Sequence, residues 1–318
     1  MDVVPKTERI RARRNRTIDL SEIETNLYRE RLVFSDEQGS FADWLNKCIR
    51  GDAFQVLKRL PEKSFDLLFA DPPYNLTKEF GSEKFRETSL AKYEHWLDSW
   101  LADCVRLLKP TASIYICGDW RSSSAIQRIG MKYFRLRNRI TWEREKGRGA
   151  KKNWKNAAED IWFFTISENF TFNLDAVKIK RRVLAPYTEN GTPKDWEKGG
   201  GGNFRNTHPS NIWTDISVPF WSMPENTDHP TQKPEKLLAK IVLASTNEND
   251  LILDPFAGSG TAAVVAKKLG RDFVAIESDE HYCLLAAKRL EMADKDKSIQ
   301  GYTNGVFWER NSGQNREG

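Results

Sequence analysis

The sequence predicts an α/β protein built on a doubly wound, mostly parallel sheet. Short apolar runs of strand type alternate with longer segments whose apolar residues recur at helical spacing, a pattern typical of parallel sheets covered by helices on both faces. Two of these runs lead directly into turns rich in proline or glycine, as ligand-binding loops at the carboxyl ends of strands do. With 318 residues, of which 39% are hydrophobic, the chain can bury a substantial core.

The elements of the first half follow a polar, arginine-rich stretch over residues 1–40. The segment 92–109 shows the clearest helical pattern, because its apolar residues recur about every four positions. Pro61 and Pro110 are expected to end helices. In order, we expect a strand at 46–50, a helix at 53–60, a strand at 65–70, the helix at 92–109, a strand at 112–117, a helix from Arg121, and strands at 138–142 and 160–166.

The second half begins with a stretch, from 170 to 222, in which regular patterning is lost. It contains four consecutive glycines (199–202) and a basic run (178–182). A loop-rich segment of this length inside an ordered protein is usually functional. Beyond it we expect a helix at 234–244 with proline in its first turn, a strand at 251–253, a helix at 263–270, a strand at 273–277 and a helix at 279–292.

Charge and composition narrow the class of protein. The net charge is +5, and basic residues gather in 1–16 and 144–155. Such clusters suit a polyanion, although solvated basic segments without a partner have the same composition. No apolar run approaches the roughly 20 residues needed to cross a bilayer, and no secretory signal is present, so we expect a cytosolic protein. The four cysteines and four histidines show no metal-ligand spacing, and no metal site is expected.

A glycine turn follows the strand at 251–253. It reads Asp254-Pro-Phe-Ala-Gly-Ser-Gly-Thr-Ala262, and Gly258 and Gly260 fit the G-x-G-x-x-[GA] pattern of nucleotide-binding turns, with Glu277 placed 19 residues after Gly258. A dinucleotide and S-adenosylmethionine both fit this pattern, and the glycines could also serve helix packing alone. A carboxylate at Asp254 repels a pyrophosphate but attracts the sulfonium and ammonium groups of S-adenosylmethionine, so it favours the methyl donor.

A second motif, Asp71-Pro72-Pro73-Tyr74, ends the strand at 65–70 and lies 183 residues before Asp254. By itself it could be an ordinary turn after a strand. In open α/β sheets, however, ligands bind outside the carboxyl ends of strands, so two such turns are expected to share one rim. Together they indicate a site that is split across the sequence.

The order of these motifs resembles that of the β group of DNA amino-methyltransferases, in which a catalytic D-P-P-Y precedes the S-adenosylmethionine loop. The resemblance covers roughly Asp52 to Arg289 and includes Gly51-Asp52, Asp71 to Asn75, Asn156 to Trp162, Asn211-Ile-Trp213, His229 to Pro234, Asp254 to Thr261, and Glu277. It implies a circularly permuted fold of the S-adenosylmethionine-dependent methyltransferase type. The expected divisions are a basic, polar arm (1–40), a catalytic half (41–169), an inserted DNA-recognition region (170–225), a cofactor-binding half (226–292) and a polar tail (293–318).

The D-P-P-Y residues fit methylation of an exocyclic amine, a poor nucleophile because its lone pair is delocalised. The Asp71 carboxylate and the Pro72 carbonyl can each accept one amine hydrogen, while Pro73 stiffens the turn and Tyr74 can stack on a flipped-out base. The family pattern for covalent attack at carbon 5 of cytosine, a cysteine after a proline, is missing, so we set that route aside. The resemblance favours N6 of adenine, because Asp rather than Ser opens the motif, and leaves the N4 amine of cytosine as the alternative.

The resemblance also implies which residues bind the cofactor. Glu277 would meet the ribose hydroxyls, Asp52 and Ala53 the adenine end, and Thr231 and Lys233 the methionine carboxylate. His229 could be either a contact or a packing residue. The complete set expected to bind S-adenosylmethionine is Asp52, Ala53, Asp71, Thr231, Lys233, Asp254, Phe256, Gly258, Gly260, Thr261 and Glu277.

The expected partner is double-stranded DNA, read by the region 170–222 and the segment 144–155. The residues expected to contact it are Arg148, Lys151, Lys152, Lys155, Arg181, Arg182 and Arg205. The sequence leaves open a homodimer and a restriction endonuclease partner, and the expected location is the cytoplasm, at the nucleoid. Two rival functions are an NAD-dependent oxidoreductase and a DNA-binding module without turnover.

Overall fold

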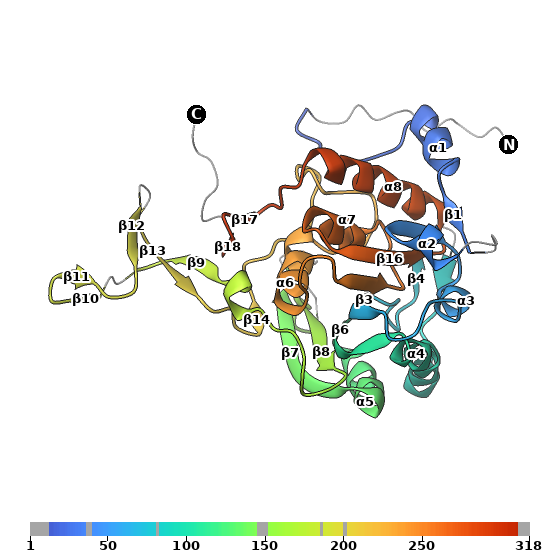
Figure 1. Cartoon of the computed structure of the whole chain (residues 1–318), viewed down its shortest axis with the longest axis horizontal. Helices are drawn as coiled ribbons and strands as arrows, with labels where there is room; N and C mark the ends of the chain where they lie inside the picture. The colour runs from blue at the N-terminus through green and yellow to red at the C-terminus, as the bar shows by residue number, and fades with distance from the viewer. Residues whose placement is uncertain are drawn as a thin grey trace.

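A nine-stranded sheet forms the centre of the protein in the computed structural model, which describes residues 13–35, 40–80, 83–144, 152–184, 187–199 and 202–310 (Figure 1). In spatial order its strands are β1 (Val33–Phe34), β2 (Lys47–Arg50), β16 (Asp272–Glu277), β15 (Leu251–Asp254), β3 (Phe65–Ala70), β6 (Leu108–Gly118), β8 (Ala158–Thr165), β7 (Arg135–Glu143) and β14 (Ile212–Trp213). The strands from β1 to β6 are all parallel, β8 runs antiparallel to both its neighbours, and β14 is parallel to β7. The predicted doubly wound, mostly parallel sheet is confirmed.

Helices cover both faces of this sheet. One face carries α6 (Glu235–Ser245), α7 (Thr261–Lys268) and α8 (Glu280–Lys295), and the other carries α3 (Ala53–Leu57), α4 (Leu90–Val105) and α5 (Ser123–Tyr133). In β3, Leu67 and Phe69 join the first layer whereas Leu68 and Ala70 join the second. Because both faces are covered, β3 is apolar at nearly every position, and each such fully buried large side chain contributes about 1.5–3 kcal/mol.

The sheet changes winding direction between β15 and β3. From β15 the chain passes through α7 to β16, towards one edge of the sheet, whereas from β3 it passes through α4 to β6, towards the other edge. The loops that leave β15 and β3 therefore diverge. A divergence of this kind leaves a crevice at the carboxyl ends of the two strands.

Two boundaries differ from the sequence expectation in this region. Helix α3 ends at Leu57 and α4 at Val105, before the prolines that were expected to end them. Pro110 instead lies inside β6, in an exposed part where the pairing with β3 is irregular. A residue without an N–H group is tolerated there because no ladder hydrogen bond is needed.

The stretch expected to be loop-rich contains a second, smaller sheet that projects from the body (Figure 1). Its strands, in order, are β12 (Glu197–Gly199), β13 (Gly202–Thr207), β9 (Ile179–Arg182), β18 (Val306–Trp308) and β17 (Tyr302–Thr303). Residues 302–308, expected to belong to a tail, therefore complete this sheet, and Phe307 is fully buried. The turn between β17 and β18 is Asn304-Gly305, with φ of 52° and 77°, as a two-residue hairpin of type I′ requires.

The expected N-terminal arm is also partly ordered. Helix α1 (Glu22–Arg29) starts at a capping box formed by Ser21 and Glu24, and its Tyr28 is buried and donates to Glu291 of α8. The other elements are α2 (Phe41–Trp44), a 3₁₀ helix η1 (Leu174–Val177), and two hairpins, β4 (Lys78–Phe80) with β5 (Glu83–Phe85) and β10 (Thr188–Glu189) with β11 (Thr192–Pro193).

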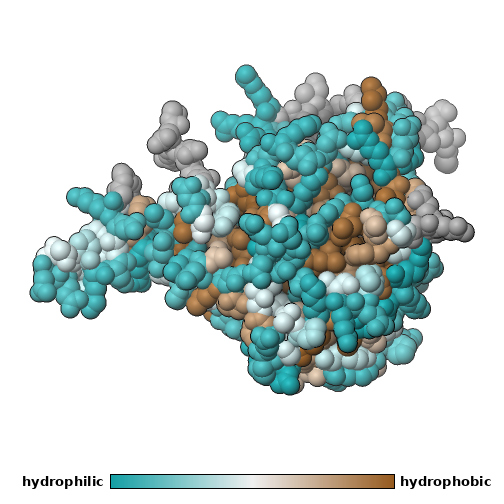
Figure 2. Space-filling model, viewed as in Figure 1, coloured by the Kyte–Doolittle hydropathy of each residue, from teal (hydrophilic) through white to brown (hydrophobic). Residues whose placement is uncertain are grey.

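The surface of the projecting sheet is mainly hydrophilic, whereas apolar side chains show between the elements of the main body (Figure 2). No helix in the described ranges is long and apolar enough to cross a membrane. Within those ranges, no group of three or more His, Cys, Asp or Glu side chains is placed to hold a metal ion.

Candidate active site

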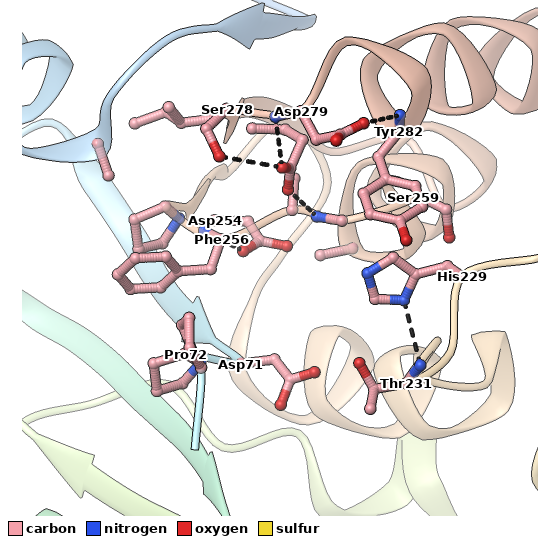
Figure 3. A pocket seen from close by; sticks show the side chains of 18 of the residues that line it. Asp71, Pro72, His229, Thr231, Asp254, Phe256, Ser259, Ser278, Asp279 and Tyr282 are labelled. Carbon is pink, nitrogen blue, oxygen red and sulfur yellow. Dashed lines mark hydrogen bonds between the residues drawn. The ribbon is translucent and has the colours of Figure 1, made fainter. Parts of the chain in front are cut away.

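A cavity of about 370 Å³ opens at the carboxyl ends of β3 and β15. Because Leu68 of β3 pairs with Leu253 of β15, Asp71 and Asp254 leave the sheet at the same edge. Figure 3 shows their carboxyl groups directed into the same space. Of the residues expected to act in catalysis or cofactor binding, the following line the cavity: Asp52, Ala53, Asp71, Pro72, Pro73, Tyr74, Thr231, Lys233, Asp254, Phe256, Gly258, Thr261 and Glu277.

Of the residues expected to act in catalysis or cofactor binding, Gly260 alone does not line this cavity. It caps α7 with φ of 78°, and a Cβ atom there would lie 2.7 Å from the Cβ of Ala286 in α8. Gly260 therefore allows α7 and α8 to pack closely, and its expected close approach to a ligand stays a prediction. At Gly258, whose φ is 54°, a Cβ would lie 2.8 Å from Nε2 of His229.

His229 both lines the cavity and packs within the protein. Its ring lies edge-on to Tyr282, with centroids 4.4 Å apart, and its Nδ1 accepts the N–H of Thr231 at 3.4 Å. The contact with Gly258 closes one side of the glycine turn. His229 thus fixes the turn against the segment that leads into α6.

Two carboxylates, those of Glu277 and Asp52, line the end of the cavity beside β16 and α3. Glu277 accepts the N–H of Gly258 at 2.7 Å and that of Asp279 at 2.9 Å. Asp52 caps α3 by accepting the N–H of Phe54 at 2.9 Å. Carboxylates held by backbone N–H groups in this way remain good acceptors for hydroxyl groups of a ligand.

Asp254 is a buried carboxyl group in the cavity wall, with 4% of its surface exposed. Its Oδ1 accepts the N–H of Phe256 at 3.1 Å. Burial raises the pKa of Asp254 to about 8, and the nearby charges of Asp71 and Glu277 add to the effect. A cation bound beside Asp254 would favour its ionised form.

Lys233 connects the D-P-P-Y turn to the rest of the site. Its buried ammonium group lies 2.6 Å from Oδ2 of Asp71 and 3.3 Å from Oε2 of Glu159. Burial alone would lower the pKa of Lys233, but the two carboxylates outweigh this and raise it above its ordinary value. The sequence did not predict this ion pair with Asp71, and the expected contact of Lys233 with a methionine carboxylate stays a prediction.

The D-P-P-Y turn is held by hydrogen bonds on several sides. The Tyr74 hydroxyl donates to Oδ1 of Asp71 at 2.9 Å, and the Tyr93 hydroxyl donates to the Pro73 carbonyl at 3.1 Å. The N–H of Asn75 donates to Oγ of Ser122, at the start of α5, at 3.2 Å. These contacts fix the backbone that presents Asp71 and the Pro72 carbonyl.

Residues 65–288, more than half of the chain, match the family model of DNA methylases known as N6_N4_Mtase. The chain belongs to this DNA methylase family. It is 36% identical to the DNA adenine methyltransferase YhdJ of Escherichia coli K12 over 266 residues, which cover 81% of this chain and 86% of YhdJ. It is also 36% identical to the Type II methyltransferase M.HpaI of Haemophilus parainfluenzae, over 77% of this chain and 74% of that one.

Two solved structures of DNA methylases share the fold of this chain. The cytosine-N4-specific PvuII DNA methyltransferase aligns with a TM-score of 0.57 and 19% identity, over 78% of this chain and 89% of that chain. A putative DNA modification methylase from Thermus thermophilus, solved in complex with S-adenosyl-L-methionine, aligns with a TM-score of 0.52 and 20% identity, over 84% and 99%. At these identities the likeness concerns the fold.

The residues expected to contact DNA lie in two parts of this methylase. Arg148 and Lys151 lie outside the described residues. Lys152 and Lys155 are exposed on the connection from β7 to β8. Because β7 is parallel to β6, this connection starts at the edge of the main sheet where the D-P-P-Y turn lies. In the projecting sheet Arg181 of β9 pairs across the strands with Arg205 of β13, next to Arg182.

Glu159 is a site residue that sequence reasoning missed in this methylase. It is the second residue of β8, its side chain is 3% exposed, and it forms an ion pair with Arg144 as well as with Lys233. The sequence offered little signal for it, because Glu159 lies just before the strand expected at 160–166, beside the acidic Asp160.

Proposed function

We propose that this protein transfers the methyl group of S-adenosylmethionine to the N6 amine of an adenine in duplex DNA. The observation that carries the proposal is the meeting of Asp71 and Asp254 in one cavity, at the point between β3 and β15 where the winding of the sheet reverses. Membership of the DNA methylase family supports the reaction class, and the activity named for YhdJ supports adenine as the base.

The cavity fits S-adenosylmethionine along its length. Apolar side chains from Ala53, Phe256 and Ile276 can hold an adenine ring, and the Glu277 and Asp52 carboxylates can accept ribose hydroxyls. The buried carboxyl of Asp254 suits the positive charge that this cofactor carries and a pyrophosphate does not. When bound, S-adenosylmethionine supplies an electrophilic methyl group on a sulfonium.

The D-P-P-Y residues prepare the amine for attack. Oδ1 of Asp71 and the carbonyl of Pro72 accept the two amine hydrogens, which draws the nitrogen towards tetrahedral geometry and localises its lone pair. Lys233 fixes the Asp71 carboxylate through the bond to Oδ2, so that Oδ1 is the oxygen that faces the amine. Holding both reactants in line supplies most of the remaining rate enhancement.

We propose that DNA lies over the rim formed by the β7–β8 connection and the projecting sheet. Lys152 and Lys155 flank Trp154, whose side chain is 93% exposed, an arrangement suited to phosphates and an unstacked base. Arg148 and Lys151 of the same connection, and Arg181, Arg182 and Arg205 of the projecting sheet, complete the proposed DNA surface. The target adenine has to leave the helix, because the amine must reach Asp71 in the cavity wall.

Cytosine N4 is the second candidate amine, because the same carboxylate and carbonyl could serve it. The PvuII enzyme shares the fold and is cytosine-N4-specific, but it is only 19% identical. Asp71 as the first residue of the motif and the 36% identity to YhdJ favour adenine.

The proposal is tested with Asp71→Ala and a control, Asp66→Ala, on strand β3 that leads into Asp71. Asp66 pairs with Lys109 at 2.8 Å and does not line the cavity. We expect Asp71→Ala to lower methylation of unmethylated DNA by at least about 10³-fold while S-adenosylmethionine still binds, because the amine loses an acceptor made for the transition state. The control is expected to remain active. A non-catalytic DNA-binding module predicts no difference between the two variants.

The proposal extends to the surroundings of the enzyme. We place it in the cytoplasm at the nucleoid, where its substrate is, and the Type II relatives favour a restriction endonuclease partner of the same target sequence. We also propose that the enzyme forms a homodimer, and light scattering with and without DNA tests this. Protection of the methylated DNA from a co-expressed endonuclease checks the proposed endonuclease partner.

A further inference from the structure

The hydroxyl of Tyr74 stands between two carboxylates. It lies 2.9 Å from Oδ1 of Asp71 and 3.4 Å from Oε2 of Glu159. A phenol has one hydrogen to donate, and the shorter distance gives it to Asp71. Both Asp71 oxygens are then engaged, Oδ1 by Tyr74 and Oδ2 by Lys233.

The proposed reaction needs one of these acceptors. The target amine has to approach Oδ1, because Lys233 is bonded to Oδ2 and is itself buried between Asp71 and Glu159. The amine and the Tyr74 hydroxyl then both use Oδ1, so the bond from Tyr74 to Asp71 weakens when the base enters. A buried hydroxyl without an acceptor is strongly unfavourable, so it needs another partner at that moment.

Glu159 is built to be that partner. It projects from the start of β8, at the same edge of the sheet as the D-P-P-Y turn, since β8 runs antiparallel to β6. Its charge is compensated on one side by Arg144 and on the other by Lys233. A buried carboxylate held by two cations stays in place and keeps a lone pair for the hydroxyl.

We propose that Glu159 is a positioning residue that accepts the Tyr74 hydroxyl when the target amine takes its place on Asp71. This inference rests on the proposed function. The transfer of one hydrogen bond from Asp71 to Glu159 frees the catalytic acceptor, and it fixes the orientation of the Tyr74 ring for stacking on the base. No proton changes its covalent owner in this step.

A simpler role for Glu159 would be to anchor Arg144 and the start of the β7–β8 connection. The two roles differ in their dependence on the Tyr74 hydroxyl. Tyr74→Phe removes that hydroxyl and keeps the ring, so a residue that acts through the hydroxyl loses its influence in this background. An anchor for Arg144 would keep its influence.

The test is a double-mutant cycle in the full-length protein, with kcat for methylation of a duplex oligonucleotide and the Kd for S-adenosylmethionine as readouts. We expect Glu159→Gln to lower kcat about tenfold or more in the Tyr74 background and less than about threefold in the Tyr74→Phe background, with the Kd unchanged within about twofold. Asp160→Asn is the matched control on β8. Its carboxylate bonds to Ser123 and Thr141, on the side away from Lys233, and normal kcat is expected.

Glu159→Asp provides a second variant if the glutamine protein does not fold. It keeps the negative charge for Arg144 and Lys233 but withdraws the oxygens from Tyr74, and the same pattern across the cycle is expected. The inference is overturned if the fold-losses in kcat from the Glu159 and Tyr74 substitutions simply multiply in the double variants, which would show that the two residues act independently. It is also overturned if both Glu159 variants have a normal kcat. In either case the proposed function stands. Absence of methylation by the unsubstituted protein overturns the proposed function, and this inference with it.

Discussion

The buried carboxyl group of Asp254 makes binding of S-adenosylmethionine depend on pH. Its pKa of about 8 in the cofactor-free protein means that the protonated form predominates there at pH 7. A bound cation lowers this pKa, so cofactor binding at pH 7 should release up to about one proton, and the affinity should rise by up to about tenfold from pH 6 to pH 7. The groups that face Asp254 are Asp71, Glu277 and Lys233.

Calorimetry measures both effects. Titrations at pH 6.0, 6.5, 7.0 and 7.5 give the affinity, and two buffers with different ionisation heats give the number of protons released. The range stops at 7.5 because an α-amino group has a pKa of about 7.7–8.0, so the cofactor itself begins to lose its charge above that pH. In Asp254→Asn we expect affinity about 10²-fold weaker, because one partner of a buried charge pair is removed, with little dependence on pH.

Stability provides the matching check. The folded cofactor-free protein holds a proton on Asp254 up to about pH 8, whereas the unfolded chain releases it near the ordinary aspartate pKa of 3.8. The folded state therefore binds more protons between these values, and Asp254 should reduce the free energy of unfolding by up to about 1.4 kcal/mol per pH unit as the pH rises through this window. Asp254→Asn should flatten that slope. Equal affinities at pH 6 and 7.5, with identical heats in both buffers, would refute the reasoning.

Two further predictions concern DNA and the C-terminal strands. Charge reversal at Lys151 and Lys152 should weaken DNA binding. It should also reduce the slope of the logarithm of the DNA-binding constant against the logarithm of the salt concentration by about 2, because each lysine is expected to contact one phosphate. The control Lys295→Glu, at the end of α8, should leave this slope unchanged. Phe307→Ala should lower the free energy of unfolding by about 3–5 kcal/mol in urea denaturation, because the side chain is fully buried, and should weaken DNA binding more than cofactor binding. A normal salt slope, or undiminished DNA affinity of the Phe307 variant, would contradict the respective assignment.

The parts of the fold and site that the sequence predicted depend on local patterns. Residues 65–70 were predicted to form a strand because they are almost entirely apolar and end at Asp71 and two prolines, and β3 has these bounds. The glycine turn was predicted from the G-x-G-x-x-[GA] pattern between a strand and a helix, and the N–H of Gly258 donates to Glu277, the acid expected 19 residues later. Asp71 and Asp254 could be brought to one rim because the carboxyl ends of parallel strands lie at the same edge.

The parts that escaped prediction depend on contacts between distant segments. The ion pair of Lys233 with Asp71 joins residues 162 positions apart, and the choice between a cofactor carboxylate and Asp71 depends on how α6 lies against β3. Glu159 becomes a site residue only because β8 inserts antiparallel beside β6. The hairpin at residues 302–308 could have been predicted locally and was missed. Asn304-Gly305 between Tyr302-Thr303 and the run from Val306 to Trp308 is typical of a two-residue hairpin turn.

The central claim is that Asp71 and Asp254 together hold an amine of a DNA base and a methyl donor. The most direct test is to incubate the purified protein with S-adenosylmethionine and unmethylated duplex DNA, digest the DNA to nucleosides, and identify the methylated product by mass spectrometry. The account predicts N6-methyladenine. N4-methylcytosine would contradict the assignment of the base, and the absence of either methylated base would contradict the account as a whole.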